Sequence, residues 1–325
     1  MTTGGFKHPD EQTWVEAAFN FVHLLLQIWF YCVVGAIRAV LPVGLLPRKS
    51  VKNDVVLITG AGSGLGRLMA VEFAKLGVKK LVLWDINENG NEETKQMVEK
   101  FNKEVHTYKI DLSNREQIAT IAAQVKEDVG PVDILVNNAG YVTGKLLADS
   151  PDESIERTMA VNTSSNLYTT KAFLPNMLDQ NHGHVVVVAS LAGKLGIRNC
   201  VDYCTSKHGA VGFANALSAE IASMGKFGVN VTVVNPYFID TGMFDGARTF
   251  APRLLPILKP QYVVNRIMEA VLTNTPEIYI PRFAYFVVFF CSFLPPKAQG
   301  TLNHYFGLNY TMDHFIGRVA KNVAN

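Results

Sequence analysis

The sequence predicts an α/β domain built on a doubly wound parallel sheet, preceded by one long apolar helix. Three observations predict this. Short apolar segments alternate with helix-length segments between residues 55 and 280. The first apolar segment runs into a glycine cluster, and residues 17–37, well ahead of it, contain no Asp, Glu, Lys or Arg. Alternation of this kind is typical of parallel strands whose two faces are covered by helices.

The predicted strands are short and rich in β-branched residues, as strands buried on both faces are. We predict strands at Val55–Thr59, Leu81–Trp84, Val105–Ile110, Ile134–Val136, Val185–Ala189, Val229–Val234 and Glu277–Ile280. The predicted helices are Gly64–Leu76, Glu92–Phe101, Arg115–Lys126, Asp152–Leu178, Tyr203–Met224 and Val263–Leu272.

Length and composition limit the class of protein. A chain of 325 residues suits one large α/β domain with additional segments. Hydrophobic residues make up 48% and charged residues 18%, which indicates a large core, a membrane contact, or both. A net charge of +2 offers no electrostatic case for binding nucleic acid. The four cysteines form no CxxC pair and no His/Cys cluster, so we expect neither disulfides nor a metal site.

The charge-free segment predicts an apolar membrane-anchor helix at about residues 17–46. At about 1.5 Å per residue, such a helix spans roughly 30 Å, the thickness of a bilayer core. Acidic residues precede the segment, which disfavours a cleaved signal peptide. Arg38, Arg48 and Lys49 follow it while only Lys7 precedes it, so the next domain is expected in the cytoplasm. A buried helix and a monotopic hairpin ahead of Pro47 remain alternatives.

The chain is therefore divided into three parts. Residues 1–50 form the tail and anchor, residues 51–280 the nucleotide-binding domain, and residues 281–325 an apolar C-terminal extension. The extension contains Phe283–Leu294, which at 12 residues is too short to cross a bilayer. It fits either a buried helix or a segment that dips into the membrane interface.

The glycine cluster Thr59–Gly66 lies between a strand and a helix, the context of a Rossmann-type phosphate-binding turn. Its glycines permit a tight turn, and the helix N-terminus offers N–H groups to a diphosphate. The residues expected to contact the cofactor here are Gly60, Ser63, Gly64, Leu65 and Gly66. Asp85 ends the second strand, where a carboxylate binds ribose hydroxyls and repels a 2′-phosphate. NAD is therefore favoured over NADP, although Asp85 would also serve as a turn or capping residue.

Several motifs together resemble the short-chain dehydrogenase/reductase family over roughly residues 53–280. Thr59–Gly66 matches its TGxxxGxG signature, and Asn137–Gly140 matches its NNAG motif. Asn162, Ser190 and the run Tyr203–Lys207 match its Asn–Ser–YxxxK tetrad. The resemblance implies an NAD-dependent oxidoreductase that moves a hydride between the cofactor and an alcohol or carbonyl compound.

The chemistry of this reaction explains the residue types. Tyr203 and Lys207 are four positions apart and share one face of a helix. The ammonium of Lys207 and the positive nicotinamide are expected to lower the pKa of Tyr203, which acts as the acid/base. Ser190 would hold the substrate oxygen, so Ser190 and Tyr203 are the substrate-binding pair. By resemblance, Lys207 and Tyr203 also contact the nicotinamide ribose, and Asn162 holds a water that relays protons from Lys207.

The resemblance extends the cofactor site beyond the glycine turn. It places Asp111 and Leu112 at the adenine, and Pro236 and Thr241 at the nicotinamide amide. The NNAG motif would line the cofactor through Asn138, Ala139 and Gly140, with Asn138 also tying strands together. The family usually has Pro-Gly where this chain has Pro236-Tyr237, so the shape of that loop is expected to differ.

Further segments look like the membrane-anchored retinol and hydroxysteroid dehydrogenase branch, nearest to its microsomal all-trans-retinol dehydrogenases. They are Leu83–Asn87, Thr169–Pro175, His182–His184 and Asp240–Phe244. This resemblance implies oxidation of all-trans-retinol at the endoplasmic reticulum membrane or a lipid droplet surface, and a homodimer in which the long helices pair. A hydroxysteroid or long-chain alcohol is the alternative substrate, and an inactive lipid-surface scaffold is the alternative function.

The loop after the sixth strand is expected to meet a lipophilic substrate. It carries six apolar side chains that would either surround such a molecule or pack on the core, namely Phe238, Met243, Phe244, Phe250, Leu254 and Leu255. His182 and His184 flank a glycine in a turn, and we expect them to have a structural role.

Overall fold

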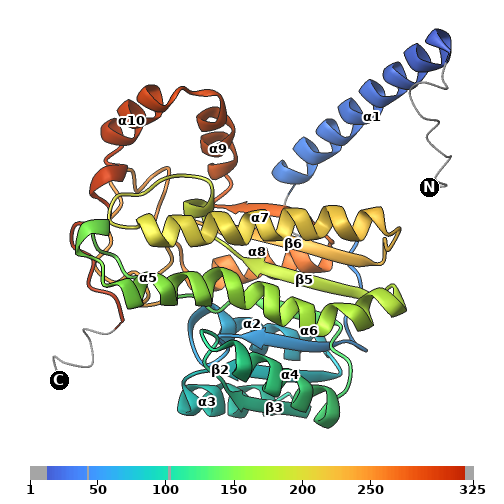
Figure 1. Ribbon diagram of the computed structural model, residues 1–325, viewed down its shortest axis with the longest axis vertical. Helices are drawn as coiled ribbons and strands as arrows, with labels where there is room; N and C mark the ends of the chain where they lie inside the picture. Colours follow the sequence, from blue (N-terminus) through green and yellow to red (C-terminus); the bar gives the residue numbers. More distant parts are fainter. Residues whose placement is uncertain (1–12, 42–43, 102–103, 319–325) are drawn as a thin grey trace. The chain divides into compact units, whose positions relative to one another are not determined.

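A computed structural model describes residues 13–41, 44–101 and 104–318. The chain divides into one compact unit that ends at Leu45 and a second that begins at Leu46. The described part of the second unit contains one parallel sheet of seven strands with helices on both faces (Figure 1). This confirms the predicted fold class.

The strand order of the sheet is β3-β2-β1-β4-β5-β6-β7, and every neighbouring pair is parallel. The strands are β1 (Val55–Thr59), β2 (Lys80–Asp85), β3 (Glu104–Lys109), β4 (Ile134–Asn137), β5 (Gly183–Val188), β6 (Val229–Pro236) and β7 (Glu277–Ile280). From β1 the chain adds β2 and β3 on one side, and from β4 it adds β5, β6 and β7 on the other side. The connections that follow β1 and β4 therefore lead toward opposite edges of the sheet. The crevice beyond the carboxyl ends of such a pair is where open α/β sheets bind ligands.

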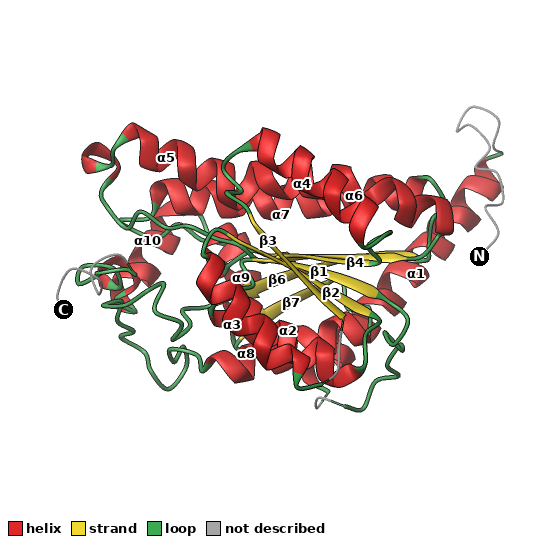
Figure 2. Cartoon of the chain, turned by 90° about the horizontal axis from the view of Figure 1, so that it is seen from below, coloured by secondary structure: helices red, strands yellow, loops and turns green. Residues whose placement is uncertain are grey.

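Each face of the sheet has its own apolar core. Helices cover both faces (Figure 2). One face packs against α2 (Gly64–Leu76), α3 (Glu88–Glu99) and α8 (Pro260–Leu272), and the other against α4 (Arg115–Asp128), α6 (Ser165–Gln180) and α7 (Val201–Ser223). Alternation along a strand serves both faces, since Val56 and Ile58 join the first core while Val55 and Leu57 join the second. Full burial on both sides explains the continuous apolar strands.

The predicted segment Asp152–Leu178 is helical throughout, but it is not a single α-helix. The chain instead forms α5 (Asp152–Met159), a π-helical turn at Ala160–Ser164, and then α6. Polar side chains in this turn bond to neighbouring elements, as when Thr163 Oγ1 donates to the Ser206 carbonyl at 2.7 Å. Turns of this width are frequent at functional sites. The apolar pattern of the sequence continues across this turn, so the pattern does not reveal the π-helical turn.

Other boundaries shift by a few residues for local reasons. Helix α3 begins at Glu88 and not at Glu92, because the Asn87 side chain caps it by accepting from the Gly90 N–H at 3.1 Å. Strand β5 begins at Gly183, two residues before the predicted start.

The first unit contains α1 (Trp14–Val40), which starts earlier and ends earlier than the predicted helix at 17–46. Thr13 and Glu16 form a reciprocal capping box that sets its start. Its segment Trp14–Ile37 has a mean hydropathy of 1.7 and is long and apolar enough to cross a membrane, with none of it buried in the structure. The charged residues that precede Thr13 lie outside the described residues.

The segment that begins at Leu46 binds back onto the sheet domain. Arg48 pairs with Glu269 of α8 at 2.6 Å, and the Lys49 ammonium lies 2.8 Å from Nδ1 of His184. The other nitrogen of His184 bonds to Thr232, and His182 bonds to Asp54. Both histidines therefore have hydrogen-bond partners within the domain, as the structural interpretation expects.

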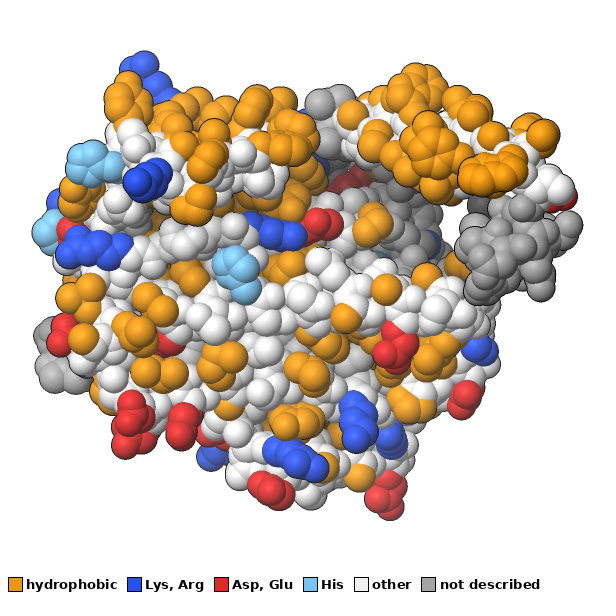
Figure 3. Space-filling view, turned by 45° about the horizontal axis from the view of Figure 1, so that its top comes forward, with side chains coloured by type: hydrophobic (Ala, Val, Ile, Leu, Met, Phe, Trp, Pro, Cys, Tyr) orange, Lys and Arg blue, Asp and Glu red, His pale blue; other side chains and the backbone are white. Residues whose placement is uncertain are grey.

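After β7 the chain forms α9 (Ala284–Phe293) and α10 (Pro296–Tyr305). Only Ala284 and Cys291 of α9 are buried, while four of its phenylalanines are 59–73% exposed: Phe286, Phe289, Phe290 and Phe293. Hydrophobic side chains gather over this part of the surface (Figure 3). Of the two alternatives for Phe283–Leu294, the buried helix is therefore wrong.

Candidate active site

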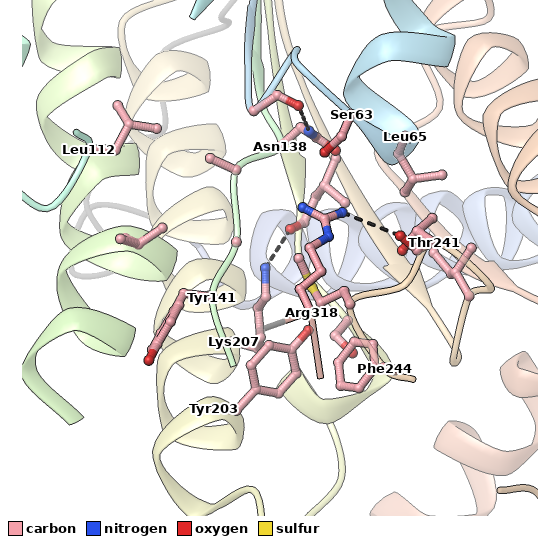
Figure 4. Close-up of a pocket in the computed structure, with 18 of the residues that line it drawn as sticks. Ser63, Leu65, Leu112, Asn138, Tyr141, Tyr203, Lys207, Thr241, Phe244 and Arg318 are labelled. Carbon is pink, nitrogen blue, oxygen red and sulfur yellow. Dashed lines mark hydrogen bonds between the residues drawn. The ribbon is translucent and has the colours of Figure 1, made fainter. Parts of the chain in front are cut away.

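A pocket lies beyond the carboxyl ends of β1, β4, β5 and β6, and it brings together most of the predicted site residues (Figure 4). Its lining includes Gly60, Ser63, Leu65, Asp85, Asp111, Leu112, Asn138, Ala139, Gly140, Ser190, Tyr203, Lys207, Pro236 and Thr241. The predicted residues absent from the lining are Gly64, Gly66 and Asn162.

The glycine turn has a backbone that other residues would strain. Gly60 and Gly64 have φ values of +67° and +53°, in the left-handed region. A methyl group on Gly66 would collide with the Gly60 carbonyl oxygen, so α2 can approach β1 only with glycine there. The Ser63 side chain makes no capping bond, which leaves the N-terminal N–H groups of α2 facing the pocket. These features suit a phosphate group held close to the backbone.

Asn138 joins the turn to the end of β4. Its amide donates to the Thr59 carbonyl at 2.9 Å and to the Gly60 carbonyl at 3.3 Å. The Thr59 hydroxyl in return accepts from the N–H groups of Asn138 and Ala139. This confirms the prediction that Asn138 ties strands together, and it holds the crevice between β1 and β4 in one shape.

From the sequence, Asp85 is expected to bind a ribose or to serve as a turn or capping residue. Its carboxylate accepts from the Gly62 N–H at 2.7 Å and from the Asn87 N–H at 2.8 Å, so it braces the turn. It also lines the pocket. Carboxylate oxygens have several acceptor positions, so these bonds leave capacity for a ribose hydroxyl.

Asp111 has a cationic partner that the sequence reasoning missed. Arg157 of α5 lies 3.2 Å from its carboxylate and also lines the pocket. Burial opposes ionisation of Asp111, but hydrogen bonds from Ser113 and the charge of Arg157 outweigh it and lower the pKa. The carboxylate is therefore kept charged beside Leu112.

Tyr203, Lys207 and Ser190 meet at the inner end of the pocket. Lys207 Nζ donates to the Val188 carbonyl of β5 at 2.9 Å and lies 5.7 Å from the centre of the Tyr203 ring. Burial lowers the pKa of Lys207 to about 8. Burial also raises the pKa of Tyr203, and a hydrogen bond with Ser190 opposes this only in part.

In the protein on its own, the pKa of Tyr203 therefore lies above its ordinary value, and its lowering beside Lys207 and a bound nicotinamide stays a prediction. Removing the phenolate from water outweighs the favourable contacts, since desolvation disfavours the charged form. A positive group that binds beside the ring would lower this pKa, because it favours the phenolate.

Asn162 occupies the π-helical turn and holds the loop after β4. Its Oδ1 accepts from the Tyr141 N–H at 2.8 Å, and its Nδ2 donates to the Tyr141 carbonyl and the Ser206 hydroxyl at 2.8 and 2.9 Å. The amide is thus committed to positioning Tyr141. A water relay through Asn162 stays a prediction.

Aromatic side chains form the wall beyond Tyr203. The ring of Phe244 lies edge-on to Tyr203 with 5.6 Å between centroids, and Phe238 packs on Phe244 at 5.1 Å. Tyr237, the departure from the usual glycine, is buried and packs on Phe238 at 4.8 Å. The unexpected side chain therefore extends the apolar wall.

Two cations in the lining were not anticipated from the sequence. Arg157 follows no motif, and Arg318 comes from the far end of the chain. Local spacing gives no signal for either, because each reaches the pocket through tertiary packing.

Comparisons with known proteins agree with this geometry. The model of the short chain dehydrogenase family matches residues 54–251. Human epidermal retinol dehydrogenase 2 is 48% identical over 276 residues, which cover 85% of this chain and 89% of the relative. Retinol dehydrogenase 10-B of Danio rerio is 42% identical over 328 residues, covering 94% and 96%.

A solved short chain dehydrogenase/reductase from Burkholderia phymatum, in complex with NAD, is 29% identical with a TM-score of 0.66, covering 74% of this chain and 93% of that one. The protein belongs to the short-chain dehydrogenase family and is an oxidoreductase. Within that family it falls in the retinol dehydrogenase branch.

The buried ammonium leads to a prediction about stability. The pKa of Lys207 is lowered from 10.5 to about 8 in the folded protein, so its charge destabilises the fold at neutral pH by about 3 kcal/mol. Lys207→Met leaves the Val188 carbonyl without its donor, which offsets about 1 kcal/mol. We expect a net rise of about 1–3 kcal/mol in the free energy of unfolding at pH 7, measured by urea denaturation.

The rise in the free energy of unfolding of Lys207→Met depends on pH. Between pH 8 and 10.5 the unfolded chain binds more protons at this position than the folded one, so wild-type stability rises with pH. The advantage of the variant is therefore full below pH 8 and fades toward pH 10.5. Lys171→Met, which removes an exposed lysine from α6, is the control. A Lys207→Met protein no more stable than wild type at pH 7 would contradict the account.

Proposed function

We propose that this protein oxidises a lipophilic alcohol with NAD⁺, converting all-trans-retinol to all-trans-retinal, with Tyr203 as the acid/base. The observation that carries the proposal is the position of Tyr203 and Lys207. They lie buried where a glycine-lined pocket meets an aromatic wall. The names of relatives that are 42–48% identical support a retinol-like substrate.

The pocket residues suit a dinucleotide. The N–H groups around Ser63 and Leu65 would bind its diphosphate, Asp85 its adenosine ribose, and Asp111 with Leu112 its adenine. Asn138 to Gly140, Pro236 and Thr241 would contain the nicotinamide end. When bound, NAD⁺ supplies the hydride acceptor and a positive charge beside the phenol. The negative charge of Asp85 disfavours a 2′-phosphate at that position.

Residues of the chain would bind the alcohol and accept its hydroxyl proton. The Ser190 hydroxyl, which accepts from the Ala192 N–H at 3.1 Å, is held where it can bind the substrate oxygen. Tyr203 would take the hydroxyl proton from the alcohol. Lys207, fixed by the Val188 carbonyl, would stabilise the phenolate that results. Burial keeps water away from this transfer.

Two apolar cavities continue the site away from the cofactor pocket. The first is lined by Ser190, Tyr203 and Phe244, and the second by Leu255, Val287 of α9 and Asn303 of α10. They share four lining residues, which are Leu191, Ile197, Tyr237 and Phe238. The apolar lining therefore extends from Tyr203 toward α9 and α10, and it suits an elongated hydrocarbon better than a polar alcohol.

The same end of the domain suits a membrane. The exposed phenylalanines of α9 flank this apolar lining and would enter the bilayer interface, so that the substrate passes from lipid into protein. Together with α1, they support attachment to a membrane, for which we propose the endoplasmic reticulum with the catalytic domain facing the cytoplasm.

Turnover by the detergent-solubilised full-length protein tests the proposal. We expect all-trans-retinol with NAD⁺ to give the highest kcat/KM, followed by a hydroxysteroid and a long-chain alcohol. NADP⁺ should be the weaker cofactor because of Asp85. Tyr203→Phe removes the proton acceptor and should lower kcat by at least about 100-fold.

The arms of this experiment distinguish the alternatives. A higher kcat/KM for a steroid or a long-chain alcohol would overturn the proposed substrate but not the proposed mechanism. Equal activity of Tyr203→Phe would refute the assigned base. An inactive wild-type protein that still binds lipid vesicles would support the scaffold alternative.

Membrane orientation has a separate test in the sequon Asn309-Tyr310-Thr311. If the domain faces the cytoplasm, Asn309 never meets the glycosylation machinery. The full-length chain made in cells should keep its gel mobility after endoglycosidase treatment and should match Asn309→Gln. A mobility shift that Asn309→Gln abolishes would overturn the predicted orientation.

A further inference from the structure

Residues 311–318, the C-terminal strap, pack along the loop that follows β6. The Arg248 N–H donates to the Thr311 carbonyl at 2.9 Å. Farther along, the N–H groups of Ile316 and Gly317 donate to the Asp245 carbonyl at 2.8 and 3.2 Å. These bonds set the path of the strap by its backbone, so the path does not depend on an exposed side chain.

Side chains hold the strap from two further directions. Asp313 pairs with Arg198 at 2.8 Å. Phe315 packs edge-on against Phe244, with 6.3 Å between ring centroids, and a methyl group on Gly144 would overlap its ring. The strap therefore joins the loop after β4 to the loop after β6, and it contacts the same phenylalanine that contacts Tyr203.

The strap brings Arg318, which is exposed, into the lining of the cofactor pocket (Figure 4). Its Nη2 donates to the Thr241 carbonyl at 3.4 Å. The same nitrogen is 3.4 Å from the position that a methyl group on Gly64 would occupy. Gly64 is the first residue of α2, so the guanidinium lies beside the N-terminus of the helix in the glycine turn.

Two positive groups thus converge on one side of the pocket. The N-terminus of α2 carries the positive end of the helix dipole, and its N–H groups have no capping side chain. Arg318 forms no ion pair with any of the described residues. Of the two carboxylates in the pocket lining, Asp85 accepts from two backbone N–H groups and Asp111 pairs with Arg157. An arrangement of this kind is stabilised when an anion lies between the two groups.

We propose that Arg318 binds the diphosphate of the dinucleotide, so that the C-terminal strap completes the cofactor site. The inference rests on the proposed dinucleotide and adds a residue that lies outside the sequence motifs of the family. A guanidinium can donate two hydrogen bonds to phosphate oxygens while α2 binds others. Since Phe315 of the strap contacts Phe244, the strap would couple cofactor binding to the wall of the substrate site.

Calorimetry on the full-length protein in detergent tests this with ADP-ribose, which has the diphosphate and lacks nicotinamide, and with adenosine, which lacks the diphosphate. At low salt, Arg318→Gln should raise the Kd for ADP-ribose about tenfold and leave that for adenosine unchanged. The difference should shrink at high salt, and Arg318→Lys should recover part of the affinity. Arg253→Gln makes the same charge change at an exposed position outside the pocket lining and should have no effect.

Each other outcome has a separate meaning. If the wild-type protein does not bind ADP-ribose, the proposed cofactor itself fails and the inference fails with it. If the wild-type protein binds and Arg318→Gln binds equally well, only the inference fails. Tighter binding by Arg318→Gln would show that the arginine obstructs the site. Equal losses for adenosine and ADP-ribose would show that it acts only by supporting the fold.

Discussion

The bond from the Lys207 ammonium to the Val188 carbonyl is the interaction on which the site depends. It joins α7 to the carboxyl end of β5, and it thereby fixes where Tyr203 lies relative to the sheet. A buried ammonium is unfavourable for folding, which is why its pKa is lowered to about 8. Strain of this kind at a buried charge is typical of a functional site, where stability is given up for chemistry.

The site has two halves with different surfaces, because different strands of the sheet lead into different loops. Backbone N–H groups, glycines and carboxylates come from the ends of β1, β2 and β4, and they suit a charged and polar cofactor. Aromatic side chains come from the loop after β6, and they continue toward α9 and α10. Tyr203 and Lys207 lie where the halves meet, so one residue pair faces both ligands. In this account, cofactor and lipid enter from different sides and meet at the phenol.

The fold and much of the site could be predicted because they depend on short-range patterns. Continuous apolar strands, the turn Thr59–Gly66 and the spacing of Tyr203 and Lys207 are all visible within a few residues. The π-helical turn at Asn162 was missed because its cause is a set of hydrogen bonds to Tyr141 and Ser206, which are distant in the sequence. The raised pKa of Tyr203 in the protein on its own could not be predicted, because it depends on burial. Arg318 was missed because only the tertiary fold brings it to the pocket. The pairing of long helices in a homodimer stays a prediction.

The most direct test of the central claim follows the hydrogen that leaves the substrate. All-trans-retinol with both hydrogens of its carbinol carbon replaced by deuterium is incubated with NAD⁺ and the full-length protein in lipid vesicles, and the recovered NADH is analysed by mass spectrometry. One deuterium per NADH and equal amounts of retinal and labelled cofactor are expected, with label transfer at least about 100-fold slower in Tyr203→Phe. Retinal that forms without label in the cofactor, or label transfer at the wild-type rate in the variant, would contradict the central claim.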